Sequence, residues 1–167
     1  MLQSLKKEVE AGEVMVNQLA DRLSVKILDK ILFASGEATI SGKGRDVLKR
    51  VGKVLATARD KDKVIRIEGH TDTVPISAKL KEKFATNWEL STARATTVVR
   101  FLAEPSKIPP DAFEAAGLGE YYPIAKNDTP AGRQQNRRIE IILYPRVSSL
   151  MEELPKLKLA PVGEAKP

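Results

Sequence analysis

One stretch of the chain, residues 65–103, constrains the fold more than any other, because it predicts a strand, a polar loop and a helix in succession. Ile65 and Ile67 alternate with polar residues, which is the two-residue period of a half-buried strand. A helix is expected to begin at Asn87, a preferred N-cap residue, and to bury an apolar stripe made of Leu90, Ala93, Val98, Phe101 and Leu102. Arg94 lies at helical spacing from this stripe, so it projects from or beside the buried face.

An arginine on a buried face needs a partner, because an unpaired buried charge is very costly. Asp72, at the expected end of the strand, is the candidate. A carboxylate and a guanidinium on one small pocket would suit a zwitterion, whose ammonium and carboxylate they would hold. The free N–H groups in the first turn after Asn87 would add anion-binding capacity. A structural bridge between Asp72 and Arg94 is the alternative, and the spacing does not decide between the two.

Three separated motifs carry a resemblance to a known family. They are Gly69-His70-Thr71-Asp72, the segment from Asn87 to Ala95, and Asn127-Asp128-Thr129 continuing to Arg138-Ile139. Together they resemble the OmpA/MotB C-terminal family of peptidoglycan-associating domains, and the segment around Trp88 looks more like its flagellar stator members. The resemblance implies that Asp72 and Arg94 grip the diaminopimelate of the peptide stem. The residues expected to bind peptidoglycan are Asp72, Arg94, Thr71, Asn87, Arg138 and Arg137.

The roles of the last two arginines stay open at this stage. Arg137 and Arg138 follow Asn136 at the entrance of a predicted strand, where they could contact carboxylates of the peptide stem or buttress Asn87 and Asp72. A structural bridge to glutamates of a neighbouring strand is the other reading.

The first 24 residues are expected to form a separate helical segment. Apolar residues recur there at alternating spacings of three and four, a heptad seam made of Leu2, Leu5, Val9, Val16, Leu19 and Leu23 and interrupted by Gly12. This pattern favours a short coiled coil and a homodimer, with a single amphipathic helix packed on its own domain as the alternative. Residues 25–147 are expected to form the binding domain, and residues 148–167, with three prolines, a mostly flexible tail.

The element order predicts an α/β (α+β) two-layer sandwich of the type β-α-β-α-β-β. Its expected elements are a strand at 25–33, a helix from a Ser41 cap to about Asp60, the strand and helix described above, and strands at 111–118 and 134–145. The resemblance implies a mixed four-stranded sheet. The polar loop at residues 73–86 is unusually long, and such loops are often functional. It is therefore expected to be a lid or a partner-binding flap, with a mobile segment of no function as the alternative.

Composition sets limits on partners and chemistry. The net charge of +6 makes an anionic partner plausible. The rival hypotheses are a binder of nucleic acid or anionic surfaces, whose affinity falls with salt, and a pure dimerisation scaffold. Cysteine is absent and there is one histidine, so we expect no metal or other cofactor. A triad of His70, Asp72 and Ser91, or a glycosidase pair among Glu68, Glu114 and Glu120, lacks supporting motifs. We therefore predict a non-enzymatic protein without a nucleic-acid partner.

The cellular setting is an expectation from the resemblance. It implies a periplasmic protein that joins a membrane-associated complex, possibly through an ion-channel partner, to the cell wall. The sequence has no 18-residue apolar run, and residues 1–14 lack the features of a signal peptide. We therefore expect the chain to be a soluble part of a longer, membrane-anchored protein.

Overall fold

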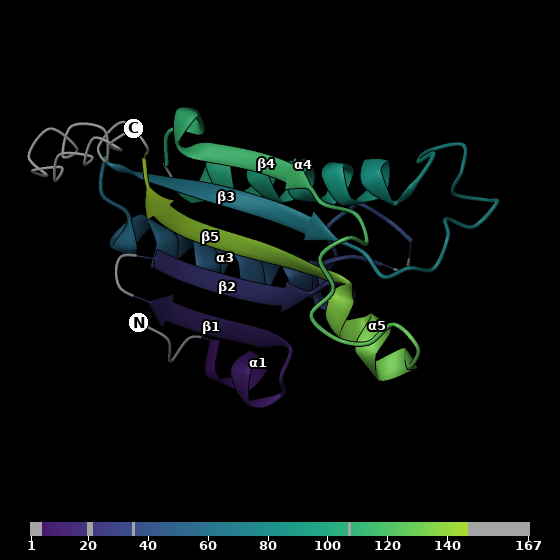
Figure 1. The fold of residues 1–167 in the computed structure, drawn as a ribbon. Coiled ribbons are helices and arrows are strands. Elements are labelled where there is room, and N and C mark those ends of the chain that lie inside the picture. Colours follow the sequence, from purple (N-terminus) through teal and green to yellow (C-terminus); the bar gives the residue numbers. More distant parts are fainter. Residues whose placement is uncertain (1–4, 20–21, 35, 107, 147–167) are drawn as a thin grey trace, which may run out of the picture.

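The computed structural model describes residues 5–19, 22–34, 36–106 and 108–146. They form a five-stranded sheet in the order β1-β2-β5-β3-β4, with α3 and α4 packed on one of its faces (Figure 1). Only the β3–β4 pair is parallel among the strand pairs of these residues. The strands are β1 (Val14–Leu19), β2 (Arg22–Leu28), β3 (Lys63–His70), β4 (Phe113–Gly117) and β5 (Arg138–Pro145). The helices are α1 (Lys6–Glu10), α2 (Asp29–Leu32), α3 (Gly42–Ala58), α4 (Asn87–Ser106) and α5 (Pro130–Asn136).

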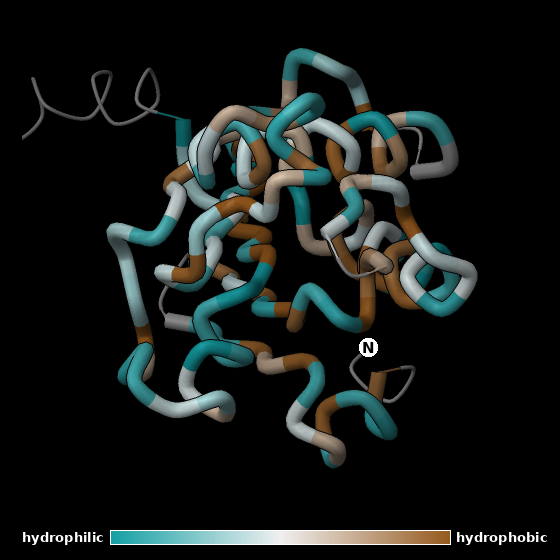
Figure 2. The backbone as a smooth tube through the Cα atoms, turned by 90° about the vertical axis from the view of Figure 1, so that its right-hand side faces the viewer, coloured by the Kyte–Doolittle hydropathy of each residue, from teal (hydrophilic) through white to brown (hydrophobic). Residues whose placement is uncertain are grey.

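The two-layer α/β prediction is confirmed, and the sheet has one strand more than the four expected. The core lies between the sheet and the two long helices. Ser41 caps α3 as predicted, because its side chain accepts a hydrogen bond from the Gly44 N–H. The buried face of α3 meets alternate residues of β3 and β5 in one cluster, which includes Val47, Leu48, Val51, Leu55, Ile65, Ile67, Ile139 and Ile141. Figure 2 shows the resulting alternation of hydrophobic and hydrophilic residues along the chain.

The predicted coiled-coil helix over residues 1–24 is wrong within the described residues. Helix α1 is one short turn, and Gly12 at φ 66° ends it. The Gly12 N–H bonds to the Val9 carbonyl and the Glu13 N–H to the Glu8 carbonyl, which is the Schellman pattern of a helix end. The chain then turns back as β1, whose Val14 pairs with Ile27 of β2. The fifth strand therefore comes from residues that had been assigned to a separate segment.

Two other element boundaries differ from prediction, and both matter for the site. The strand expected at 25–33 ends at Leu28, and Asp29 opens the short helix α2. The strand expected to begin at Gln134 begins at Arg138, because α5 occupies the preceding residues. The N-cap of α5 is Thr129, whose side chain accepts a hydrogen bond from the Gly132 N–H.

The beginning of α4 was predicted correctly, but its cap is different. Thr86 Oγ1 accepts from the Trp88 N–H, and the Glu89 carboxylate accepts from the Thr86 N–H in return. This reciprocal pair is a capping box. The Asn87 side chain is consequently not used as a cap and is available for contacts outside the helix.

The polar loop between β3 and α4 folds back toward the domain. Its Ile76 is buried, and the loop has turns around residues 78–83. The predicted flexible tail at 148–167 lies outside the described residues. None of the helices in the part of the chain that the structure describes is long and apolar enough to cross a membrane.

Candidate functional site

A pocket of about 600 Å³ lies where β3 ends, and several parts of the chain form its walls. The end of β3 contributes Thr71 and Asp72, α2 contributes Asp29, and the entrance of β5 contributes Arg137. Helix α4 adds the side chains of Asn87, Leu90 and Arg94. Asp72 and Arg94 therefore share one pocket, as the zwitterion hypothesis requires.

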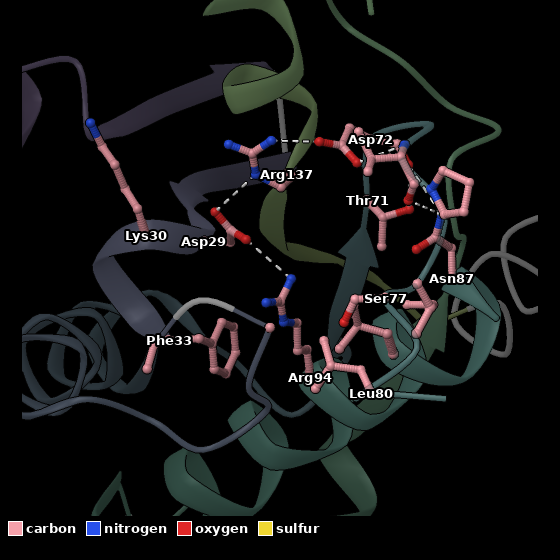
Figure 3. A pocket seen from close by; sticks show the side chains of 16 residues that line it. Asp29, Lys30, Phe33, Thr71, Asp72, Ser77, Leu80, Asn87, Arg94 and Arg137 are labelled. Carbon is pink, nitrogen blue, oxygen red and sulfur yellow. Dashed lines mark hydrogen bonds and ion pairs between the residues drawn. The ribbon is translucent and has the colours of Figure 1, made fainter. Parts of the chain in front are cut away.

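Four charged side chains of alternating sign form a row along this pocket (Figure 3). Arg94 Nη1 donates to Asp29 Oδ2 at 3.1 Å, and Arg137 Nε lies 3.7 Å from Asp29 Oδ1. Arg137 Nη1 in turn donates to Asp72 Oδ2. Asp72 and Arg94 thus do not bond to each other, because Asp29 and Arg137 stand between them. We call these four residues the charged row.

Asp29 is the member of the row that the sequence reasoning missed. It is 9% exposed, and burial raises the pKa of its carboxyl while the guanidiniums of Arg94 and Arg137 act to lower it. Its position is fixed by the backbone as well, because its N–H donates to the Arg137 carbonyl at 2.9 Å. Asp29 therefore holds both arginines in place from one end of α2.

Arg94 is buried, with 3% of its surface exposed, and Glu37 and Phe33 orient it together with Asp29. Its Nε donates to the Glu37 carbonyl at 2.9 Å, and its Cζ lies 5.0 Å from the centroid of the Phe33 ring. Burial lowers the pKa of its guanidinium, but an arginine remains charged at any physiological pH. Among the described residues Nη2 has no hydrogen-bond partner, which leaves its two N–H groups for a ligand.

Both carboxylate oxygens of Asp72 accept hydrogen bonds that fix the side chain in place. Its Oδ1 accepts from the Val74 N–H at 3.0 Å, and its Oδ2 accepts from Arg137. Each oxygen retains a lone pair, so the carboxylate can still accept from an ammonium group.

Thr71 and Asn87 complete this side of the pocket. The Thr71 N–H donates to the Gly119 carbonyl at 2.9 Å. Asn87 Nδ2 lies within hydrogen-bonding distance of the Asp72 and Val74 carbonyls and of Glu120 Oε2. Asn87 thereby joins the loop after β3 to the loop after β4.

Arg138 lies apart from the other predicted site residues. Consecutive residues of a strand point to opposite faces, so Arg137 faces the pocket while Arg138 faces the sheet surface that α3 and α4 leave open. There its guanidinium donates to Glu140 at 2.7 Å and to the carbonyls of Asn136 and Tyr122. These contacts are structural, but Glu140 lies on β5 itself, whereas the structural reading expected a glutamate of a neighbouring strand. For Arg137, the structure shows the predicted buttress of Asp72.

The long loop supplies the apolar wall of the pocket. Val74, Pro75, Ile76 and Leu80 line it, and Figure 3 shows Leu80 and Ser77 beside Arg94. The aliphatic part of a ligand would therefore lie against this loop while its charged groups reach the row. Whether the loop opens and closes as a lid stays a prediction.

The catalytic arrangements considered above gain no support from the geometry. Ser91 is fully buried, and its hydroxyl donates to the Trp88 carbonyl and accepts from the Gly119 N–H. It therefore braces α4 against the loop after β4. Within the described ranges, no three or more acidic or histidine side chains gather closely enough to hold a metal ion.

The fold and the pocket define a small two-layer α/β binding domain with a charged cleft at the end of its central strands. The chain belongs to the OmpA family, whose model matches residues 32–137. This match covers the charged row except Asp29, together with Asn87 and the loop between β3 and α4.

Similar proteins extend the comparison beyond that segment. Motility protein B of Bacillus subtilis is 34% identical over 153 residues, which are 87% of this chain and 57% of that protein. Among solved structures, the cell wall anchor of the T6SS from Pseudomonas aeruginosa matches with a TM-score of 0.76 and 30% identity, over 87% of this chain and 96% of that one. A MotB-like protein from Desulfovibrio vulgaris matches with a TM-score of 0.75 and 26% identity, over 86% and 85% of the two chains. The chain spans a little over half the length of the Bacillus protein.

Proposed function

We propose that this domain binds peptidoglycan without catalysis, through the diaminopimelate of the stem peptide. The observation that carries the proposal is the charged row, which presents Asp72 and Arg94 in one pocket of about 600 Å³. Membership of the OmpA family and the likeness to a T6SS cell wall anchor support attachment to the cell wall, the coarser part of this proposal.

The chemistry of the row suits a ligand that carries both charges on one carbon atom. Asp72 would accept hydrogen bonds from the ligand's ammonium, and the N–H groups of Arg94 Nη2 would hold its carboxylate. Asp29 and Arg137 keep these two groups apart, so the ligand does not have to break a direct ion pair to enter. Binding both groups of one stereocentre while the alkyl chain lies along the loop gives stereochemical selectivity.

We extend the proposal to the biological role. A domain of this kind would anchor a membrane-associated complex to the wall within the cell envelope, in the periplasm where there is one. A flagellar stator, with its ion-channel partner, is a candidate because a motility protein and a MotB-like protein are among the relatives. The homodimer remains a prediction, and the helix on which it was based is not present in the described residues.

Sedimentation with purified sacculi tests the binding site. Asp72→Asn and Arg94→Lys should lose retention, with a loss on the order of 2–5 kcal/mol in binding, because each removes one half of the charge recognition. Lys30→Ala is the matched control, since Lys30 borders the pocket but extends away from the row in Figure 3. Thermal unfolding of each variant establishes that it is folded.

Calorimetry with stem peptides tests the ligand itself. A peptide with lysine in place of diaminopimelate lacks the second carboxylate and should bind much more weakly. If folded Asp72→Asn and Arg94→Lys variants bind sacculi like the wild type, the proposed site is wrong. Retention that disappears with added salt and ignores peptide chemistry would instead favour the anionic-surface rival.

A further inference from the structure

Two exposed aromatic side chains stack on each other beside the pocket. Trp88 at the start of α4 is 44% exposed and Tyr121 is 60% exposed. Their ring centroids are 5.0 Å apart and the ring planes differ by 24°. Large aromatic side chains contribute most of their free energy when buried, so an exposed stacked pair indicates a surface that a ligand covers.

The pair continues directly from the wall of the pocket. Trp88 follows Asn87 and Tyr121 follows Glu120, and the Asn87 amide donates to Glu120 at 2.8 Å while also reaching the Asp72 carbonyl. The Thr71–Gly119 backbone hydrogen bond makes a second link between the same two loops. The stacked rings are therefore next in sequence to Asn87, which lines the charged pocket, and to Glu120, which accepts a hydrogen bond from Asn87.

A glycine in a left-handed conformation brings Tyr121 onto Trp88. Gly119 has φ 56°, a region that favours glycine, and it begins the turn that leads to Tyr121. A Cβ at this position would lie 3.4 Å from the Tyr121 ring and 3.6 Å from Trp88. The turn thus holds the Tyr121 ring against one face of the Trp88 ring, and the outer faces of the pair are left for a ligand.

We infer that Trp88 and Tyr121 form a second subsite, which binds an amino-sugar ring of the glycan strand that carries the stem peptide. This inference rests on the proposed function, because the peptide in the pocket delivers the sugar. A pyranose ring has an apolar face of C–H groups that can stack on an aromatic ring, and hydroxyl groups at its edge. Glu120 precedes Tyr121 in the chain, and its second carboxylate oxygen can accept a hydrogen bond from that edge.

The size of the surface favours a sugar over a protein. Two aromatic side chains offer at most about 500 Å², whereas each partner in a standard protein–protein interface buries about 800 Å². The adjacency of Trp88 to Asn87, which lines the pocket, also fits a linked ligand, because each residue of a stem peptide spans up to about 3.6 Å. One fragment of peptidoglycan can therefore occupy the pocket and the stacked pair together.

Trp88 is the only tryptophan of the chain, so its fluorescence reports on this surface directly. The full chain is titrated with a free stem peptide and with the same peptide still joined to its disaccharide. The disaccharide-peptide should bind roughly three- to tenfold more tightly, the factor expected from one aromatic stacking contact, and should change the Trp88 emission. Tyr121→Ala should remove this advantage and leave the affinity for the free peptide unchanged, whereas Tyr121→Phe should keep it.

The outcomes separate this inference from the proposed function. If the free peptide binds and the disaccharide adds nothing, the sugar subsite is wrong and the charged pocket stands. If Tyr121→Ala lowers the affinity for both ligands equally, the stacked rings only stabilise the turn and the inference also fails. If neither ligand binds the wild type, or if Asp72→Asn binds the free peptide unchanged, the proposed function itself is wrong.

Discussion

Asp29 and Arg94 are 65 residues apart in the chain, yet the carboxylate of one accepts a hydrogen bond from the guanidinium of the other at 3.1 Å. Their side chains are 12% and 4% exposed, so the pair is largely removed from water. Arg137 approaches the same carboxylate from the other side. Asp29 is therefore the residue on which the geometry of both arginines depends.

Removing this carboxylate should destabilise the domain. We expect Asp29→Ala to cost about 3–5 kcal/mol, because it leaves Arg94 buried without its partner. Urea unfolding measures the change, and Glu10→Ala is the matched control, since the Lys6–Glu10 pair is exposed to solvent and should contribute almost nothing. Equal stability of the wild type and Asp29→Ala would show that the row is not a buried charge network.

The contact between β4 and α4 leaves no space for a side chain at Gly117. A Cβ there would meet the Thr92 hydroxyl and lie 2.6 Å from the Thr92 backbone nitrogen. We expect Gly117→Ala to lower the unfolding free energy by about 1–3 kcal/mol, the usual cost of overpacking. Gly42→Ala, in α3, is the control, because nothing lies within 4 Å of its Cβ position. It should leave stability unchanged or raise it by up to ~1 kcal/mol, and similar losses in both variants would contradict the packing argument.

Low pH should destabilise the fold through protonation of Glu68, which lies on the sheet face that α3 and α4 do not cover. His70 Nε2 lies 3.5 Å from its carboxylate, at the limit of hydrogen bonding, and Arg66 Nε donates to it at 2.8 Å. These neighbours hold the pKa of Glu68 below its ordinary value of 4.5. Because the unfolded chain then binds the proton more readily, the stabilisation is complete above pH 4.5 and is lost as the pH falls through the lowered folded pKa.

A pH series of unfolding free energies tests this prediction. Glu68→Gln cannot titrate, so the advantage of the wild type over the variant should shrink as the pH falls from about 6 to about 3. A difference that stays constant, or grows in acid, would show that Glu68 does not have the lowered pKa.

Leu5 and Val9 distinguish the observed N-terminal structure from a coiled coil. Both belong to the apolar seam of residues 1–23, but Leu5 is 1% exposed in the core while Val9 is 41% exposed. Leu5→Ala should therefore cost about 2–5 kcal/mol, and Val9→Ala should change stability little. A coiled coil predicts that both substitutions matter and that both reduce dimerisation. Analytical ultracentrifugation of the two variants measures that second effect.

Much of the fold follows from patterns that the sequence displays openly. The helical stripe after Asn87 and the alternation around Ile65 both predicted their elements, because each pattern is long enough to exclude other periods. The Thr86–Glu89 capping box is also visible in the sequence as T-x-x-E. This motif predicts Thr86, and not Asn87, as the N-cap residue of the helix.

The N-terminal strand and Asp29 were missed for a different reason. Residues 14–19 fit a heptad as well as a strand, and only Gly12, a residue favoured just after a helix end, argued for the second reading. Asp29 lies inside an apolar run that resembled one strand, although Leu28, Ile31 and Leu32 already show helical spacing. Its pairing with Arg94 joins residues that no local pattern relates, so only the tertiary structure shows it.

The charged row contains two arginines and two aspartates, so its net charge is zero although the whole chain carries +6. Alternating charges produce a field that decays over a few ångströms, in contrast to the far-reaching potential of a cluster of one sign. The row therefore acts on a molecule only once it has entered the cleft. The contribution of the row to the rate of ligand association should accordingly depend little on ionic strength. The row discriminates between ligands at contact and not during their approach.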